Sequence, residues 1–301
     1  MRLLTRKDSR MKTNRGIPGI VLVLIVLLGP TARGAGVMGP PTAILEEGQW
    51  SVGLEGGYAE TGLKADGIRL NRPEGEQATY SGQFIDLKGL TSRMVFANLA
   101  YGVCDNWDLF VRIGTADARD HAVARTAPFS ASPGRFRHDG DYGLACGFGT
   151  RATFCYWGPW QFGGTTQITW LDPGKDRFAW SDPEVPGSTV SGSADADLWH
   201  AQAGLAVTYQ IDAFRFWAGP FVQFVRGHFD HSGQTFTDGL ATGSFTSSGD
   251  IEETSQAGVH FGALWQVSRK ANCWIEGQYT SDSWVFGFGA AVVPSRILPG
   301  R

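Results

Sequence analysis

Few residues of this sequence are charged, and beyond its N-terminus it has no long hydrophobic run. Charged residues make up 18% of the 301 residues and aromatic residues 12%, a balance that excludes a disordered chain. After residue 34, no apolar run approaches the roughly 20 residues that a transmembrane helix needs. A membrane could therefore be crossed only by strands closed into a barrel. The 41 glycines have no period of three, which excludes collagen.

Sequence motifs for metal binding and catalysis are also missing. The 4 cysteines form no Cys-x-x-Cys pair, so zinc and thioredoxin-like sites have no support. The acidic stretch Asp230–Glu253 lacks the regular spacing of a Ca²⁺ loop. Gly-x-Ser-x-Gly, His-Glu-x-x-His and phosphate-loop motifs are absent. We therefore expect a protein that is not an enzyme and that needs neither a cofactor nor a metal.

The first 34 residues have the parts of a secretory signal peptide. Basic residues come first, Ile20–Leu28 is purely aliphatic, and Ala32-Arg33-Gly34 places small residues at a cleavage site. As an uncleaved anchor, the apolar core would be too short to span a membrane. Residues 1–34 carry seven Lys or Arg and one Asp of a chain whose net charge is −3, so the exported part carries −9. We therefore expect no basic surface for nucleic acid.

From residue 49 to residue 293, apolar and polar side chains alternate in successive segments. A period of two is typical of strands whose two faces meet different surroundings. Most segments run for about 10–15 residues, which suits a tilted membrane strand better than a soluble sandwich. The predicted strands are Gln49–Ala59, Arg93–Val103, Trp107–Ala116, Tyr142–Tyr156, Trp160–Leu171, Asp197–Tyr209, Phe214–Phe229, Thr254–Val267, Cys273–Thr280 and Trp284–Val293. Phe214–Phe229 is apolar on both faces, so its orientation stays open.

The apolar face of these strands is predicted to face lipid. It often begins or ends in Trp or Tyr, as at Trp160 and Trp170, whereas the other face is mostly Gly, Ser, Thr and Gln. This pattern is typical of membrane barrels with aromatic girdles and a polar interior. The alternative is a soluble barrel with an inward aromatic face and a ligand cavity. The scarcity of Lys and Glu on the polar face disfavours it.

Short and long connections alternate along the chain. Tight turns fall at 104–106, 157–159, 210–213 and 268–272, and long polar connections at 60–92, 117–141, 172–196 and 230–253. In outer-membrane barrels the turns are periplasmic and the loops lie outside. We predict an all-β fold, a single transmembrane antiparallel up-and-down β-barrel of about ten strands. A hairpin around Gly82–Leu90 would raise this number, which stays open between about 8 and 12.

The same pattern divides the chain into four parts. These are the signal peptide at 1–34, a Gly- and Pro-containing linker at 35–48, the barrel at 49–293 and a C-terminal tail at 294–301.

The segment Tyr101–Gly114 resembles the strand–turn–strand units of bacterial outer-membrane β-barrel proteins of the small, OmpA-like type. It contains two alternating strands around Asp105-Asn106. The resemblance extends over residues 49–293 and implies a cell-envelope protein in the outer membrane of a Gram-negative-type bacterium. The implied partners are outer-membrane lipid, the barrel-assembly machinery and an unknown extracellular ligand, with no nucleic acid. Such barrels often end in an aromatic residue, whereas this chain runs on through 294–301.

Several charged and imidazole side chains fall on the predicted inner face. The interior of a small barrel is just wide enough for side chains, and buried charges must be paired. The mixture of signs therefore favours a lumen filled by Arg–carboxylate pairs over a polar pore or a ligand-binding interior. The predicted lumen-facing residues are Glu55, Asp108, Arg112, Arg151, His200, Arg215, His260 and Glu276.

Export to an oxidising compartment would allow a disulfide. Cys104, Cys155 and Cys273 lie near tight turns and hence near one rim, whereas Cys146 is predicted to face lipid. Cys104–Cys155 is the favoured pair, although their predicted strands are not neighbours.

The favoured function is a non-enzymatic structural role, or a surface contact through long extracellular loops. The first alternative is a narrow porin-like channel for ions or small solutes. The second is a barrel enzyme, either lipid-modifying or an omptin-like protease. In such a protease an acidic side chain would orient a histidine base. The protease candidates are Asp117, Asp120 and His121 in one loop and Asp230 and His231 in another.

Overall fold

The computed structural model describes residues 36–71, 77–80, 85–117, 119–120, 123–124, 134–135, 138–139, 142–172, 176–181 and 188–294. Within these ranges the chain forms strands, turns and bends, and the fold is all-β as predicted. No helix in the described part is long and apolar enough to cross a membrane. The predicted signal peptide at 1–34 and all but the first residue of the predicted tail lie outside these ranges.

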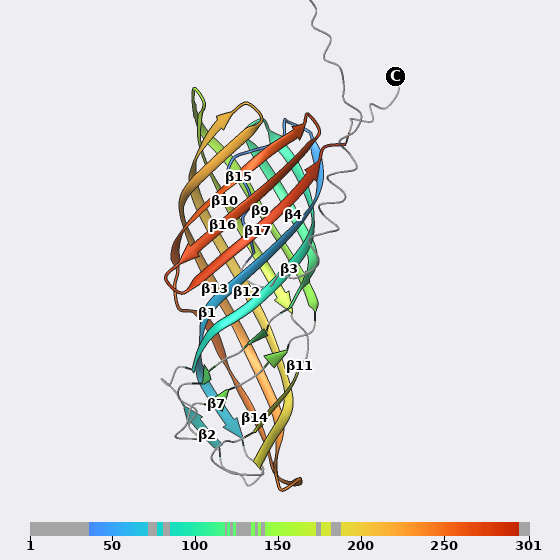
Figure 1. The fold of residues 1–301 in the computed structure, drawn as a ribbon, viewed down its shortest axis with the longest axis vertical. Coiled ribbons are helices and arrows are strands. Elements are labelled where there is room, and N and C mark those ends of the chain that lie inside the picture. Colours follow the sequence, from blue (N-terminus) through green and yellow to red (C-terminus); the bar gives the residue numbers. More distant parts are fainter. Residues whose placement is uncertain are drawn as a thin grey trace, which may run out of the picture. The chain divides into compact units, whose positions relative to one another are not determined.

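Ten antiparallel strands form a closed wall (Figure 1). Each strand pairs with the next wall strand along the chain, and the last pairs with the first, Ser283–Val292 lying opposite Val52–Thr61. The predicted up-and-down barrel is therefore confirmed. The wall strands are β1 (Trp50–Asn71), β3 (Ile85–Cys104), β4 (Trp107–Ala116), β9 (Gly143–Trp157), β10 (Trp160–Asp172), β12 (Ser188–Ile211), β13 (Phe214–Thr237), β15 (Ala257–Ser268), β16 (Ala271–Thr280) and β17 (Ser283–Val292).

The long connections contain more strand than predicted. β12 and β13 are each 24 residues long, and Ile85–Leu90, within the region considered for an extra hairpin, is the first part of β3. The reason is that Ser, Thr and Gly stretches stay extended when a neighbouring strand pairs with them. The additional strands are β2 (Gln77–Tyr80), β5 (Arg119–Asp120), β6 (Val123–Ala124), β7 (Gly134–Arg135), β8 (His138–Asp139), β11 (Asp176–Ser181) and β14 (Leu240–Glu253).

Beyond the wall, the paired ends of β1, β12 and β13 continue together with β14, and we call this sheet the strand extension (Figure 1). β14 pairs with Arg226–Thr237 of β13 on one side and with Leu63–Asn71 of β1 on the other. Asp238 and Gly239, both with positive φ (51° and 78°), connect β13 to β14. Two such residues are what a tight hairpin turn requires. The strand extension lies at the end of the barrel opposite the tight turns.

Side chains on the wall are apolar outside and mixed inside. In β4, Leu109, Val111 and Ile113 are exposed, whereas Asp108 and Arg112 are buried. The same alternation decides the orientation of β13, which the sequence left open. Its outward residues include Phe214, Phe216, Val222 and Phe224, and its inward residues include Trp217, Phe221, Gln223 and Val225.

Aromatic pairs mark two levels on the outer face. Trp50 and Tyr101 have ring centroids 4.6 Å apart near the tight turns. Tyr58 and Trp284, 5.1 Å apart, lie towards the opposite end. Trp50 and Tyr58 are separated by about 27 Å along β1 at about 3.4 Å per residue, or about 20 Å vertically at the usual tilt. This is close to the height of a lipid-facing apolar band, which is about 25 Å.

Residues 36–45, predicted as part of a linker, lie inside the barrel, and we call them the luminal segment. Val37, Met38, Thr42 and Leu45 are at most 3% exposed. The backbone of the segment is hydrogen-bonded to side chains from β4, β9, β10, β13 and β16, strands that are distributed around the ring. A solvated linker would have no such partners. The predicted linker is thus held at these residues by wall side chains that lie far away in sequence.

Candidate functional site

The inner wall supplies acceptors for the amides of the luminal segment. The Gly39 N–H donates to Glu276 Oε2 over 2.7 Å, and the Ile44 N–H donates to Asp108 Oδ2 over 2.8 Å. The Ala43 N–H donates to the Thr153 hydroxyl over 3.1 Å. Backbone groups removed from water need such partners. Side chains of the wall thus replace the strand neighbours that this segment lacks.

The carbonyl groups of the segment find donors on the wall in the same way. Val37 O accepts hydrogen bonds from Arg112 Nη1 and Gln167 Nε2, each over 3.0 Å. Ala43 O accepts one from Arg215 Nη1 over 3.2 Å. Bonds from charged groups are the stronger kind, so two arginines fix the height of the segment in the lumen.

Three glutamines, Gln167, Gln202 and Gln278, form a chain of amides that we call the glutamine belt. Gln167 Nε2 donates to Gln202 Oε1 over 2.5 Å, and Gln202 Nε2 donates to Gln278 Oε1 over 2.8 Å. Gln278 Nε2 then lies 3.3 Å from Glu276 Oε1. At one end of the belt, Gln167 binds Val37 of the luminal segment directly. At the other end, Gln278 reaches the segment through Glu276, which accepts the Gly39 N–H.

Two Arg–carboxylate pairs lie on the inner wall. Arg151 Nε lies 2.8 Å from Asp108 Oδ2, with the Asp108 side chain fully buried. Arg112 Nη1 lies 3.9 Å from Glu55 Oε2, and Asn98 Nδ2 donates to Glu55 Oε1 over 2.8 Å. These pairs provide the neutralisation that charges need away from water.

The predicted lumen-facing residues all lie on the inner side of the wall. Asp108, Arg112, Arg151, His200, His260 and Glu276 are at most 9% exposed, and Glu55 and Arg215 are partly buried. Seven of these eight contact the luminal segment or one another. His200 lies between Thr169 and Val225 of the neighbouring strands. In the described part of the chain we find no bond from His200 to the luminal segment.

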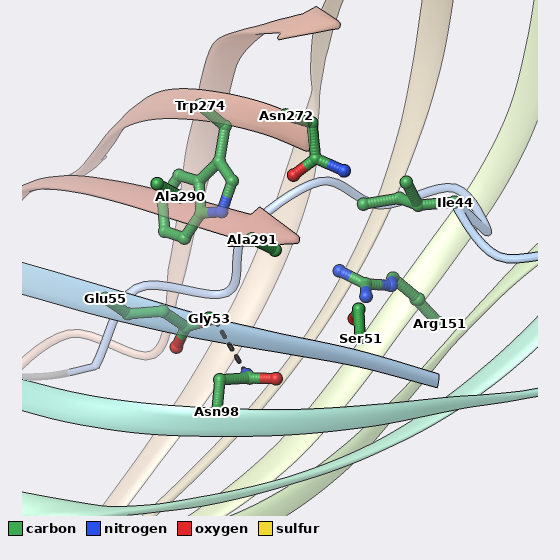
Figure 2. Close-up of a pocket in the computed structure, with 10 residues that line it drawn as sticks. All are labelled: Ile44, Ser51, Gly53, Glu55, Asn98, Arg151, Asn272, Trp274, Ala290 and Ala291. Atoms are coloured by element: carbon green, nitrogen blue, oxygen red, sulfur yellow. Dashed lines mark hydrogen bonds between the residues drawn. The ribbon is translucent and has the colours of Figure 1, made fainter. Parts of the chain in front are cut away.

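Between the luminal segment and strands β1, β16 and β17 a small polar cavity remains (Figure 2). Figure 2 shows Ile44 of the segment beside Asn272 of β16, with the Glu55–Asn98 pair below them. The cavity offers about 20 Å³ to the centres of water molecules, and one water needs about 10–15 Å³. Asn272 Oδ1 is buried here without a hydrogen-bond partner among the described residues. The cavity therefore suits a bound water.

The predicted Cys104–Cys155 disulfide is not formed, and all four cysteines are free thiols. β4 lies between β3, which carries Cys104, and β9, which carries Cys155. Two strand spacings separate the backbones by about 10 Å, beyond the roughly 7 Å that a disulfide can bridge. Cys104 Sγ instead lies 3.0 Å from Asn106 Oδ1.

The structure describes only some of the candidate protease residues. Asp117 is 1% exposed, and His121 lies outside the described residues. Asp230 is exposed in β13, and the side chain of His231 lies outside the described part of the structure.

A different exposed cluster lies on the strand extension. His228 Nδ1 is 3.0 Å from Asp250 Oδ1 and His228 Nε2 is 3.7 Å from Asp230 Oδ1. Sequence reasoning missed this cluster, although a period of two puts His228 and Asp230 on one face. Within the described ranges no three His, Cys, Asp or Glu side chains are grouped to hold a metal.

The comparisons with known proteins found similar solved structures only. No protein-family model and no curated protein sequence matches the chain. The outer-membrane protease OmpT from Escherichia coli is 8% identical over 81% of this chain and 94% of its own, with a TM-score of 0.39. The outer-membrane protein OprG from Pseudomonas aeruginosa is 11% identical over 84% and 99%, with a TM-score of 0.36. The outer-membrane protein AlkL is 11% identical over 89% and 100%, with a TM-score of 0.33.

The closed ten-stranded wall and its apolar outer face define the class of this protein. It has the architecture of an outer-membrane-type β-barrel, a closed antiparallel up-and-down wall with an apolar outer face. The similar structures include a protease and an outer-membrane channel.

Proposed function

We propose that this protein is a non-enzymatic outer-membrane barrel, closed to solutes, that presents its strand extension to partners at the cell surface. The observation that supports closure is the occupied lumen. Side chains alone fill the interior of an eight-stranded barrel, and ten strands leave little more room than one extended chain needs. The luminal segment, the ion pairs and the glutamine belt occupy that room.

The strand extension is the part of the molecule best suited to meet a partner. It carries exposed residues such as Ser191, Gln234, Ser244 and Thr246, and its strands are held in register with one another. A paired sheet is a stiffer platform than a set of mobile loops. The surface-contact role predicted for long loops is thus proposed for an ordered sheet, with the extracellular ligand still to be identified.

Conductance in a planar bilayer tests whether the barrel is closed. Residues 35–301 are refolded in detergent, and a heat-dependent shift in gel mobility verifies that the barrel has formed. We expect the folded protein to insert without discrete current steps. Steps from the unmodified protein would show that the barrel is open and would overturn this proposal.

A gated channel is the second candidate, and the nature of the inner wall favours it. Asp108, Gln167, Gln202, Gln223 and Glu276 are buried on that wall. Removing the luminal segment would therefore leave a polar lumen. In the same bilayer, deletion of residues 36–45 should produce current steps, whereas a channel gated in use would show them in the unmodified protein as well.

The proposal includes export through a cleaved signal peptide and insertion by the barrel-assembly machinery. Gly36 O already accepts a bond from Gln167 Nε2 in the lumen, over 3.3 Å. Cleavage after Gly34 would leave one residue before that position. Mass spectrometry of the protein isolated from outer membranes should give Ala35 as its first residue, and an intact Met1 would contradict the cleavage.

A further inference from the structure

The wall between β12 and β13 has a defect at mid-height. Gly204 pairs with Phe221 and Val207 pairs with Ala218, but the two residue pairs between them are missing from the ladder. The residue opposite Leu205 is Pro220, which has no N–H to donate. The Leu205 carbonyl thus loses its ladder partner in a part of the protein surrounded by lipid, where unsatisfied backbone groups are costly. We call Leu205, Ala206, Gly219 and Pro220 the seam.

A histidine from the next strand takes the place of the missing donor. His260 Nε2 lies 3.3 Å from Leu205 O, and the His260 side chain is fully buried. A carbonyl oxygen can only accept, so the hydrogen in this contact belongs to Nε2.

Gly204 makes room for this histidine and for the luminal segment at the same point. A Cβ on Gly204 would lie 3.1 Å from His260 Nε2 and 3.2 Å from Met38 Cε. Both distances are tighter than ordinary contacts. The seam, His260 and the luminal segment therefore meet at Gly204.

Glu276 connects the histidine to the luminal segment. His260 Nδ1 lies 3.5 Å from Glu276 Oε1, an ion pair when the imidazole carries a proton on both nitrogens, and both side chains have no exposed surface. The other carboxylate oxygen, Oε2, accepts the Gly39 N–H over 2.7 Å. A continuous path of polar contacts thus runs from Leu205 in the wall through His260 and Glu276 to Gly39 in the lumen.

We propose that His260 and Glu276 form a latch that ties the luminal segment to the seam, so that the two loosen together. If the segment leaves Glu276, the carboxylate loses the bond that holds it under His260, and Leu205 loses its donor in turn. If the seam opens, the same contacts are lost in the opposite order. The latch rests on the closed lumen and does not depend on what the strand extension binds.

Hydrogen exchange of the full exported chain in detergent, followed by mass spectrometry, tests the latch. His260→Leu removes both polar contacts at similar volume. His200→Leu is the matched control because His200 is equally buried on β12, on the other side of β13. We expect His260→Leu to accelerate exchange at least tenfold in peptides covering 204–207 and in peptides covering 36–39. His200→Leu should change neither. Acceleration at the seam alone, or the same pattern in both variants, would overturn the proposal.

Gly39→Ala tests the latch from its other end and does not touch the seam. Gly39 has φ +74°, a conformation that alanine adopts with strain, so the Gly39 N–H should be displaced from Glu276. A Cβ on Gly39 would contact the Trp274 ring, at 3.6 Å, and not the seam. We therefore expect faster exchange at 204–207 only if the latch transmits the change. If hydrogen exchange at 204–207 is as slow in Gly39→Ala as in the unmodified protein, the result contradicts the latch. If His260→Leu fails to form a heat-modifiable barrel, Gly39→Ala decides the question alone.

Discussion

At the scale of single residues, burial determines how much each polar contact in the lumen contributes. Asp108 and Asp105 both accept an N–H of residues 36–48, from Ile44 and Glu47 respectively. Asp108 is fully buried and also pairs with Arg151, whereas Asp105 is exposed in a turn. The two carboxylates therefore make similar bonds in very different surroundings.

Asp108→Ala should destabilise the barrel strongly. The substitution leaves Arg151 buried without its partner, and breaking a buried pair from one side costs about 3–5 kcal/mol. Urea unfolding of the refolded protein measures the loss. Asp105→Ala, the exposed control, should cost less than about 1 kcal/mol because water replaces the lost bond. Equal losses from both variants would argue against a dry, paired lumen.

Residue type and alternation predicted the charged side of the lumen but not its amide network. Gln167, Gln202 and Gln278 fell on the polar face of their predicted strands, yet a period of two cannot say which of them meet across the barrel. β12 and β16 are not neighbours in the wall, and the Gln202–Gln278 bond depends on the closure of the whole ring. Such contacts depend on three-dimensional spacing that no local pattern carries.

At the scale of elements, tight turns made strand ends predictable and polar stretches did not. Trp107–Ala116 was predicted with both ends correct, because a turn and an aromatic residue mark its start. β12 and β13 were predicted too short, because their outer halves lack apolar alternation. The Asp238-Gly239 dipeptide is a usable hairpin signal within 230–253, where the polar composition led to the prediction of a loop.

The β13–β14 hairpin should depend on the backbone conformation of Gly239. Gly239 has φ +78°, and a methyl group added at either Gly239 or Gly243 would point into open space. Gly239→Ala should therefore cost about 1–2 kcal/mol locally from the left-handed conformation alone, and Gly243→Ala should cost much less. Proteolysis within 235–245 reports the difference. Equal cleavage rates for the two variants would be evidence against this turn.

A side chain added to the inner wall at Gly287 should displace the luminal segment, because it would occupy the same space. A Cβ on Gly287 would lie 1.9 Å from Val37 Cγ1, so Gly287→Ala cannot accommodate the segment in place. Overpacking of this kind costs about 1–3 kcal/mol. We expect faster amide exchange at 36–39 in an otherwise intact barrel. Adding Val37→Gly removes the clashing atoms and should slow that exchange again, and a double variant that behaves like the single one would contradict this packing.

The luminal segment also marks the limit of local sequence reasoning. Its Gly39-Pro40-Pro41 core is typical of a linker, and it has no strand or helix period. Val37, Met38, Ile44 and Leu45 are unusually apolar for a solvated connection, which was the one available signal. The partners that hold the segment lie between 64 and 237 residues away in sequence, as with Asp108 and Glu276.

At the scale of the whole molecule, the lipid environment is what made the architecture predictable. A strand in a membrane must be apolar on one face along its whole length, so the pattern persists in every wall strand. The function of the protein produces no comparable repeating pattern in the sequence. It depends on what the strand extension meets and on whether the lumen ever opens, and neither leaves a periodic signal.

A charged substitution on the outer face of the wall should destabilise the barrel, whereas the same substitution on the strand extension should not. Val111 is 53% exposed near the middle of β4, and Val111→Arg should destabilise the barrel in lipid by about 2–4 kcal/mol. Thr246→Arg, on the exposed strand extension, should have almost no effect. Unfolding in liposomes compares the two variants, and a neutral Val111→Arg would mean that this face does not meet lipid.

The occupied lumen is tested most directly by a cross-link between the luminal segment and the wall. Cysteines replace Val37 and Gly287 in a chain whose native cysteines are changed to serine. Val37→Cys removes the Cγ atoms that a side chain at position 287 would clash with. A Cβ at position 287 would lie 2.8 Å from Val37 Cβ, and disulfide-bonded Cβ atoms are about 3.5–4.5 Å apart, so a small shift suffices.

Oxidation of the folded barrel should link the two positions, and mass spectrometry should find the joined peptides. A cysteine at Gly277, whose Cβ would face Phe261 instead, serves as the control partner and should give no link with position 37. If positions 37 and 287 stay unlinked while both thiols react with maleimide, the segment is not in the lumen.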